Sequence, residues 1–93
     1  MPSQPGDGPD AEAALKIVVY GRPDCHLCDE AIRRIRELVA DRPGVELESV
    51  NIESDDDLLR RYLERIPVVV AEGETVSELV FDPGPLRTRL GIA

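Results

Sequence analysis

The chain's two cysteines and its single histidine lie within one short segment, Cys25-His26-Leu27-Cys28. A C-x-x-C pair that follows a β-rich run and precedes an amphipathic helix is typical of a redox dithiol. Thiol–disulfide exchange needs two sulfurs that can bond reversibly, one of which attacks as an accessible thiolate. If Cys25 stands at the start of the helix, the spacing of one turn places both sulfurs on the same helix face. The pair could then open and close with little backbone movement.

The two cysteines are expected to have different roles, because they occupy different places on the predicted helix. Free backbone N–H groups and the positive end of the helix dipole stabilise an anion at the N-terminus, which favours the thiolate of Cys25. Cys28 lies one turn further along the helix and should be more buried. Cys25 is therefore the predicted nucleophile, and Cys28 is the predicted resolving thiol.

Charged neighbours act on this thiolate in opposite directions. Arg22 favours the charged form, whereas nearby carboxylates oppose it. The carboxylates belong to Asp24, Asp29 and Glu30. A histidine has a reference pKa of ~6.5 and is mostly neutral at neutral pH. We therefore expect a modestly activated Cys25, with His26 as a solvent-facing residue that tunes the dithiol beside the bound substrate.

The composition favours one small domain with a tail in front of it. The chain has 93 residues, and residues 1–14 combine prolines, glycines and aspartates without a periodic apolar pattern, so they are predicted to be a disordered tail. Residues 15–93 then form the domain. The tail lacks the basic and apolar regions of a signal peptide, and no run approaches the ~18 apolar residues of a membrane span.

Charge and aromatic content exclude several classes of partner. The net charge of −8 disfavours a nucleic-acid backbone or an anionic membrane surface. With no Trp, one Phe and two Tyr, the chain offers no stacking platform for bases. We expect a cytoplasmic monomer. In that compartment thiols are kept reduced, so a C-x-x-C pair is expected to be catalytic or metal-binding rather than a permanent structural disulfide.

The segments around the dithiol have patterns that would position it. Leu15 to Tyr20 is a nearly continuous β-branched run, which predicts a strand buried on both faces inside a parallel sheet. Asp24 is the predicted N-cap of the following helix, and Pro43-Gly44 ends it or begins the next loop. Apolar residues recur at helical spacing along this helix and should face the sheet. They are Leu27, Ala31, Ile32, Ile35, Leu38 and Val39.

The second half of the chain predicts two further helices and three strands. Residues 45–52 form a strand whose alternation changes phase at Ser49, as a bulge or a strand end would explain. Ser54 and the aspartates after it begin a helix with acids at its favourable end. Residues 68–71 and 75–81 form an antiparallel hairpin around residues 72–74, and residues 86–90 form the last helix.

The resulting order is strand, helix, strand, helix, strand, strand, helix. It predicts an α/β fold in which a βαβ unit is followed by a ββα unit, giving a four-stranded mixed sheet with helices on both faces.

This order, the C-x-x-C at the first helix and a proline before the third strand together resemble the thioredoxin fold, most closely the glutaredoxin-like thiol–disulfide oxidoreductases. The resemblance covers Leu15 to Leu90. It implies that Pro67 follows a cis peptide bond beside the dithiol and that the backbone of Ile66 pairs with the substrate's chain. Cis bonds are rare enough to indicate a purpose.

The resemblance also bears on substrate recognition. Arg22 matches a basic residue that binds a glutathione carboxylate in the family, and a guanidinium suits that contact because it can engage a carboxylate bidentately. Two features depart from the family pattern: His26-Leu27 replaces Pro-Tyr, and Phe81-Asp82-Pro83-Gly84 replaces a Gly-Gly and acid. Glutathione is therefore only a possible co-substrate, and no cofactor is expected. Leu27 is expected to be an exposed apolar contact for a partner.

The predicted function is reduction of a disulfide in a protein or in a glutathione adduct, with glutathione or a thioredoxin-reductase-type enzyme as reductant. A purely structural disulfide is a weaker reading, since closing so short a loop contributes only about 2 kcal/mol. One C-x-x-C supplies two of the four ligands of a closed zinc site, so zinc or a [2Fe–2S] cluster would need a dimer. The remaining alternative is a thioredoxin-fold adaptor that docks a partner without turnover.

Overall fold

The computed structural model describes residues 15–91. The predicted tail at residues 1–14 lies outside the described residues. The helices and strands are β1 (Leu15–Gly21), α2 (His26–Leu38), β2 (Val45–Asn51), a 3₁₀ turn η2 (Ile52–Ser54), α3 (Asp56–Tyr62), β3 (Val68–Ala71), β4 (Glu74–Ser77) and α4 (Pro83–Leu90). Among the helices of this described part, none combines the length and apolar character that a membrane crossing requires.

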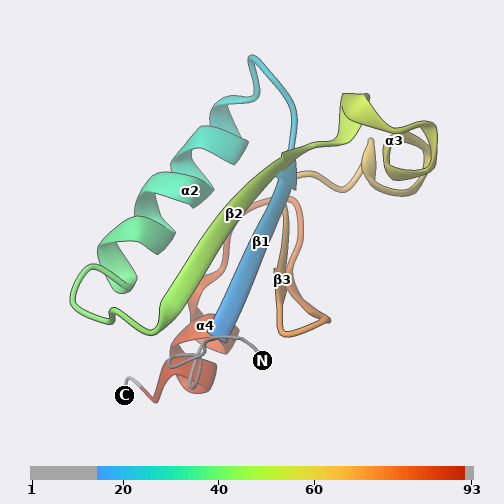
Figure 1. Ribbon diagram of the computed structural model, residues 1–93. Helices are drawn as coiled ribbons and strands as arrows, with labels where there is room; N and C mark the ends of the chain where they lie inside the picture. Colours follow the sequence, from blue (N-terminus) through green and yellow to red (C-terminus); the bar gives the residue numbers. More distant parts are fainter. Residues whose placement is uncertain (1–14, 92–93) are drawn as a thin grey trace.

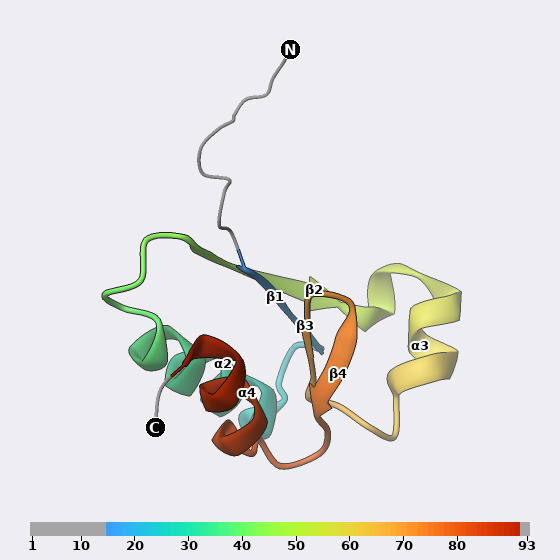
Figure 2. The same cartoon turned by 90° about the horizontal axis from the view of Figure 1, so that it is seen from below.

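The strands form one four-stranded mixed sheet in the order β2-β1-β3-β4. β1 pairs in parallel with β2 and antiparallel with β3, and β3 pairs antiparallel with β4. Helices α2 and α4 lie on one face of the sheet and α3 on the other (Figures 1 and 2). The predicted α/β architecture with a βαβ unit followed by a ββα unit is confirmed.

Alternating side chains of the inner strands build a core on each face. Ile17 and Val19 of β1 are fully buried with Ile35 of α2 and Leu86 of α4. On the other face, Val68 of β3 packs with side chains of η2 and α3. On one face of β1, Ile17, Val19 and Gly21 are buried, whereas on the other face Val18 and Tyr20 are half-buried and Lys16 is exposed. The sequence pattern had predicted burial on both faces. The loop after β1 extends from this inner part of the sheet.

Several element ends differ from the sequence-based prediction. Asp24 is not the N-cap of α2: its φ of 63° is left-handed, and Cys25 caps the helix instead. Asp55, rather than Ser54, caps α3, because its carboxylate accepts the N–H groups of Asp57 and Leu58. No bulge interrupts the pairing of β2 with β1 at Ser49, and the register shift of the sheet lies between β3 and β4.

The strand β4 is shorter than predicted, and α4 begins earlier. β4 ends at Ser77, whose hydroxyl oxygen accepts the N–H of Asp82, and the chain then turns away from the sheet. Phe81, predicted to lie in the strand, is buried in the core after this turn. Asp82 caps α4, and Pro83 occupies its first turn, where a missing N–H costs nothing.

Leu79 has a backbone conformation that favours glycine. Its φ is 66°, and its side chain is 53% exposed. We expect the free energy of unfolding of Leu79→Gly to be about 1 kcal/mol higher than that of Leu79→Ala. The glycine variant is the more stable because only glycine avoids the Cβ penalty of left-handed backbone. Urea unfolding of both variants measures this difference. At Thr75, which is exposed in β4 and has no positive φ, alanine should be the more stable of the two. Equal stability of the Leu79 variants would contradict the assignment.

Candidate functional site

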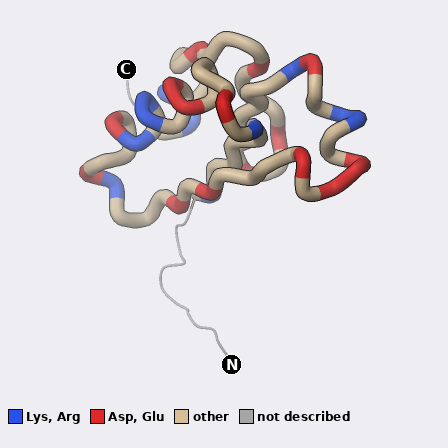
Figure 3. Tube along the Cα trace, turned by 90° about the horizontal axis from the view of Figure 1, so that it is seen from above, with Lys and Arg blue, Asp and Glu red and all other residues tan. Residues whose placement is uncertain are grey.

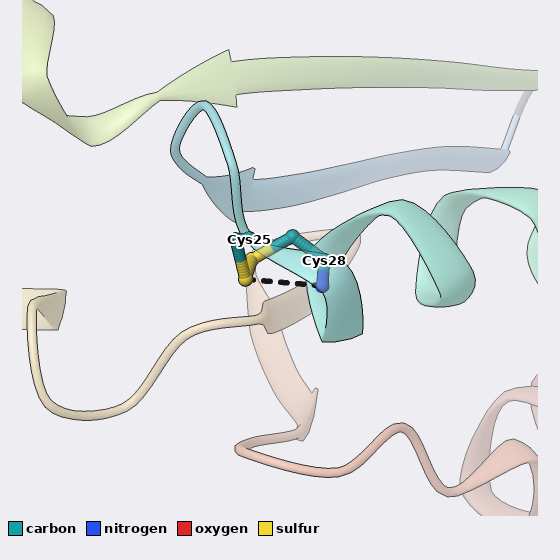
Figure 4. Close-up of a disulfide and its surroundings, with 2 residues drawn as sticks. All are labelled: Cys25 and Cys28. Atoms are coloured by element: carbon teal, nitrogen blue, oxygen red, sulfur yellow. Dashed lines mark hydrogen bonds between the residues drawn. A yellow bond between two sulfur atoms is a disulfide. The ribbon is translucent and has the colours of Figure 1, made fainter.

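The two cysteines form a disulfide at the N-terminus of α2, with their Cα atoms 5.2 Å apart. Cys25 has extended backbone and is the N-cap, and its Sγ accepts the backbone N–H of Cys28 at 3.1 Å (Figure 4). Cys28 is 2% exposed, whereas Cys25 is half-buried. The expected difference in burial is present. A charge on the Cys25 sulfur would be stabilised by this N–H and by the helix dipole.

Gly21, the last residue of β1, packs directly against Cys28. A Cβ at this position would lie 2.8 Å from the Sγ of Cys28 and 2.9 Å from its Cβ. The backbone of β1 and the first turn of α2 therefore touch through Cys28. Gly21 was not among the residues predicted to form the site. Its signal was available: a glycine after a buried strand often marks a close approach of backbone to another group.

Pro67 lies one strand away from this contact. Tyr20 pairs with Val68 in the antiparallel register of β1 and β3, so Gly21 and Pro67 are the next positions along the same pair. The Ile66–Pro67 peptide bond is cis, and Pro67 is buried. The register of the sheet thus places Pro67 opposite the glycine that touches Cys28. Figure 4 shows the start of α2 with the two sulfurs and the neighbouring strands.

The other predicted contact residues face solvent around the helix start. Arg22 and His26 are exposed, and Leu27 is 44% exposed, as an apolar contact residue would be. Their contact with a substrate stays a prediction. Among residues 15–91, no three side chains of His, Cys, Asp or Glu gather as a metal-binding group.

Arg65 and Glu78 form an ion pair next to the segment that carries Ile66 and Pro67. The side-chain hydrogen bond raises the pKa of Arg65 and lowers the pKa of Glu78 from its ordinary value of 4.5. Partial desolvation opposes both shifts, and Coulomb attraction adds to them. This pair could not be found from the sequence, because its partners are 13 residues apart and meet only when the segment after β4 lies beside the segment before β3.

Charge is otherwise interspersed along the chain. Figure 3 shows the acidic residues at the start of α3 and the arginines toward its other end. This arrangement complements the helix dipole at both ends.

The reduced protein should react with iodoacetamide at Cys25 first. Because Cys25 is accessible and is the N-cap, whereas Cys28 is almost fully buried, we expect at least about tenfold faster alkylation at Cys25. Peptide mapping by mass spectrometry after limited reaction measures the ratio. The ratio should approach one in guanidinium chloride, where the fold is lost. Preferential alkylation of Cys28 in the native protein would exclude the assignment of Cys25 as nucleophile.

Acid should weaken the Arg65–Glu78 pair. A carboxylate with a lowered pKa in the folded state stabilises the fold above its ordinary pKa of 4.5, and this stabilisation is lost as pH falls through the folded value. In Arg65→Met the pKa of Glu78 should rise toward its ordinary value, as an NMR titration of the carboxyl carbon would measure. Arg60→Met is the matched control, because Arg60 pairs with Asp57 instead. An unchanged titration in Arg65→Met would show that the pair is absent in solution.

Comparison with known proteins shows similarity over nearly the whole described domain. The family model described as "Glutaredoxin-like domain (DUF836)" matches residues 16–90. Comparison with the curated proteins gives no match.

Solved structures from bacteria and a parasite share the fold. The solution NMR structure of protein Ne2328 from Nitrosomonas europaea is 33% identical with a TM-score of 0.71, over 96% of this chain and 98% of that chain. The X-ray structure of protein XcR50 from X. campestris is 35% identical with a TM-score of 0.60, over 83% and 97%. Fasciola hepatica thioredoxin, at 20% identity and a TM-score of 0.57 over 84% and 79%, is similar in fold alone.

Proposed function

Because the chain belongs to the glutaredoxin-like domain family, we propose that it is a thiol–disulfide oxidoreductase that reduces disulfides in proteins or in glutathione adducts through Cys25 and Cys28. The observation that carries the proposal is the disulfide between these residues at a helix N-terminus, with Cys25 as the N-cap. In this arrangement one sulfur can react with a client while the other stays within bonding distance. The fold of the family and the C-x-x-C pair support redox chemistry in general.

In the proposed reaction, the Cys25 thiolate attacks one sulfur of the client disulfide. The client's sulfur–sulfur bond breaks, its other sulfur leaves as a thiolate that takes up a proton, and a mixed disulfide joins Cys25 to the client. Cys28 then loses its proton and attacks the Cys25 sulfur. This step forms the Cys25–Cys28 disulfide and releases the second client thiol. The client gains two electrons from the protein and two protons. Cys28 gives up one proton, and the other is equivalent to the proton that Cys25 released to solvent when it became a thiolate.

Turnover needs a reductant that returns the disulfide to the dithiol. We propose glutathione or a thioredoxin-reductase-type enzyme for this step, with the reaction located in the cytoplasm and carried out by a monomer. We propose that Arg22, His26 and Leu27 contact the client, and their exposure near the start of α2 supports this role. Ile66 and Pro67 provide the backbone on the β3 side. No bound cofactor is required for either exchange step.

The two cysteine variants should separate the steps of the mechanism. We expect Cys25→Ser to abolish reduction of insulin and of a glutathionylated peptide, because no nucleophile reaches the client. Cys28→Ser should still form the mixed disulfide but should not resolve it, since the second thiol is missing. Mass spectrometry without added reductant would detect the trapped adduct at Cys25.

The control is the wild-type protein carried through the same steps, in which the adduct should be resolved rapidly. Wild-type protein that reduces neither substrate with either reductant would favour an adaptor that docks partners without turnover. Activity that survives in Cys25→Ser would contradict the assigned nucleophile.

A further inference from the structure

Arg65 connects three separate parts of the chain immediately before Ile66. Its backbone N–H donates to the carbonyl of Tyr62 at 2.8 Å, and its own carbonyl accepts the N–H of Leu79 at 3.0 Å. Its guanidinium pairs with Glu78 and lies 5.6 Å from the centre of the Tyr62 ring. The end of α3, the segment before β3 and the segment after β4 therefore meet at one residue.

This junction is joined to the dithiol by a short series of contacts. Arg65 is followed by Ile66 and Pro67. The last pair of β1 with β3 is Tyr20 with Val68, and its register continues to Gly21 and Pro67 as the next opposite positions. Gly21 in turn touches Cys28. A displacement of Arg65 would therefore move the backbone beside the disulfide, while the first turn of α2 would keep its own hydrogen bonds.

Glu78, the acidic partner of the ion pair, is followed by two exposed apolar side chains. Leu79 follows Glu78 directly, and Val80 comes next, with 53% and 66% of their surfaces exposed. Leu79 has left-handed backbone that the hydrogen bond to Arg65 helps to hold. The ion pair thus couples the position of these side chains to the position of Ile66 and Pro67.

We propose that the Arg65–Glu78 ion pair is a positioning element of the exchange site, which aligns the Ile66–Pro67 segment and the Leu79–Val80 segment to receive a polypeptide client. The inference rests on the proposed function. Neither side chain touches the reacting sulfurs, so the pair affects how a peptide is bound and not how Cys25 reacts. A small disulfide, which needs no extended backbone contact, is insensitive to it.

The test compares two substrates in Arg65→Met, which keeps much of the side-chain stem but removes the charge. We expect the KM for insulin reduction to rise about fivefold, a size typical of losing a partly exposed ion pair. The rate with the small disulfide 5,5′-dithiobis(2-nitrobenzoate) should stay unchanged. Arg60→Met is the matched control: it removes the ion pair with Asp57 on the same helix and should leave both substrates unaffected.

Two further variants keep the test decisive if Arg65→Met folds poorly. Glu78→Gln removes the partner charge with almost no change in shape and should raise the KM for insulin in the same way. The double variant Arg65→Glu with Glu78→Arg should bring the KM back toward the wild-type value, because the pair is restored in reverse. Thermal unfolding of every variant separates this effect from a general loss of structure.

The outcomes distinguish this inference from the proposed function. Wild-type protein that reduces neither substrate overturns the proposed function and this inference with it. Active wild-type protein, combined with an unchanged KM for insulin in Arg65→Met and Glu78→Gln, overturns the positioning role alone. Equal losses with both substrates, or no recovery in the reversed pair, also overturn it, because they indicate a general structural effect or separate effects of the two side chains.

Discussion

The contact between Gly21 and Cys28 is the constraint on which the site depends. It joins the end of the central strand β1 to the first turn of α2 at a distance that leaves no room for a side chain on the strand. Because β1 also pairs with β3, the register at the end of the same strand continues from Val68 to Pro67. The end of β1 is therefore next to the dithiol and next in register to the backbone that we propose to contact a client.

The chemistry of the pair follows from the helix that begins there. The N–H of Cys28 would be one of the unpaired donors of the first helical turn, and the Cys25 sulfur accepts it. A sulfur at this position gains its stabilisation from the backbone itself. This backbone contact is the physical basis for proposing Cys25 as the nucleophile in a strongly acidic chain with several carboxylates close in sequence to the dithiol.

The fold and the dithiol could be predicted from the sequence because their signals are local. The nearly continuous β-branched run of residues 15–20, the helical spacing after Cys25 and the turn at Glu72-Gly73 are each signals that lie within a few neighbouring residues. The missed features depend on tertiary contact. Nothing near Asp24 shows that Cys25 will cap α2 in its place, and the Arg65–Glu78 pair exists only once the segment after β4 lies beside the segment before β3. The left-handed backbone of Leu79 is likewise held by a hydrogen bond that its N–H donates to the carbonyl of Arg65.

The near-complete burial of Cys28 means that only one of the two cysteines can be joined to a client in the proposed exchange. A client of any size can be joined to the protein only through Cys25, because Cys28 has almost no exposed surface from which to form an adduct. Every covalent intermediate would then have the same orientation, with its leaving bond facing the interior thiol. A mixed disulfide at Cys28 would not compete with the one at Cys25, since a client cannot reach the Cys28 sulfur.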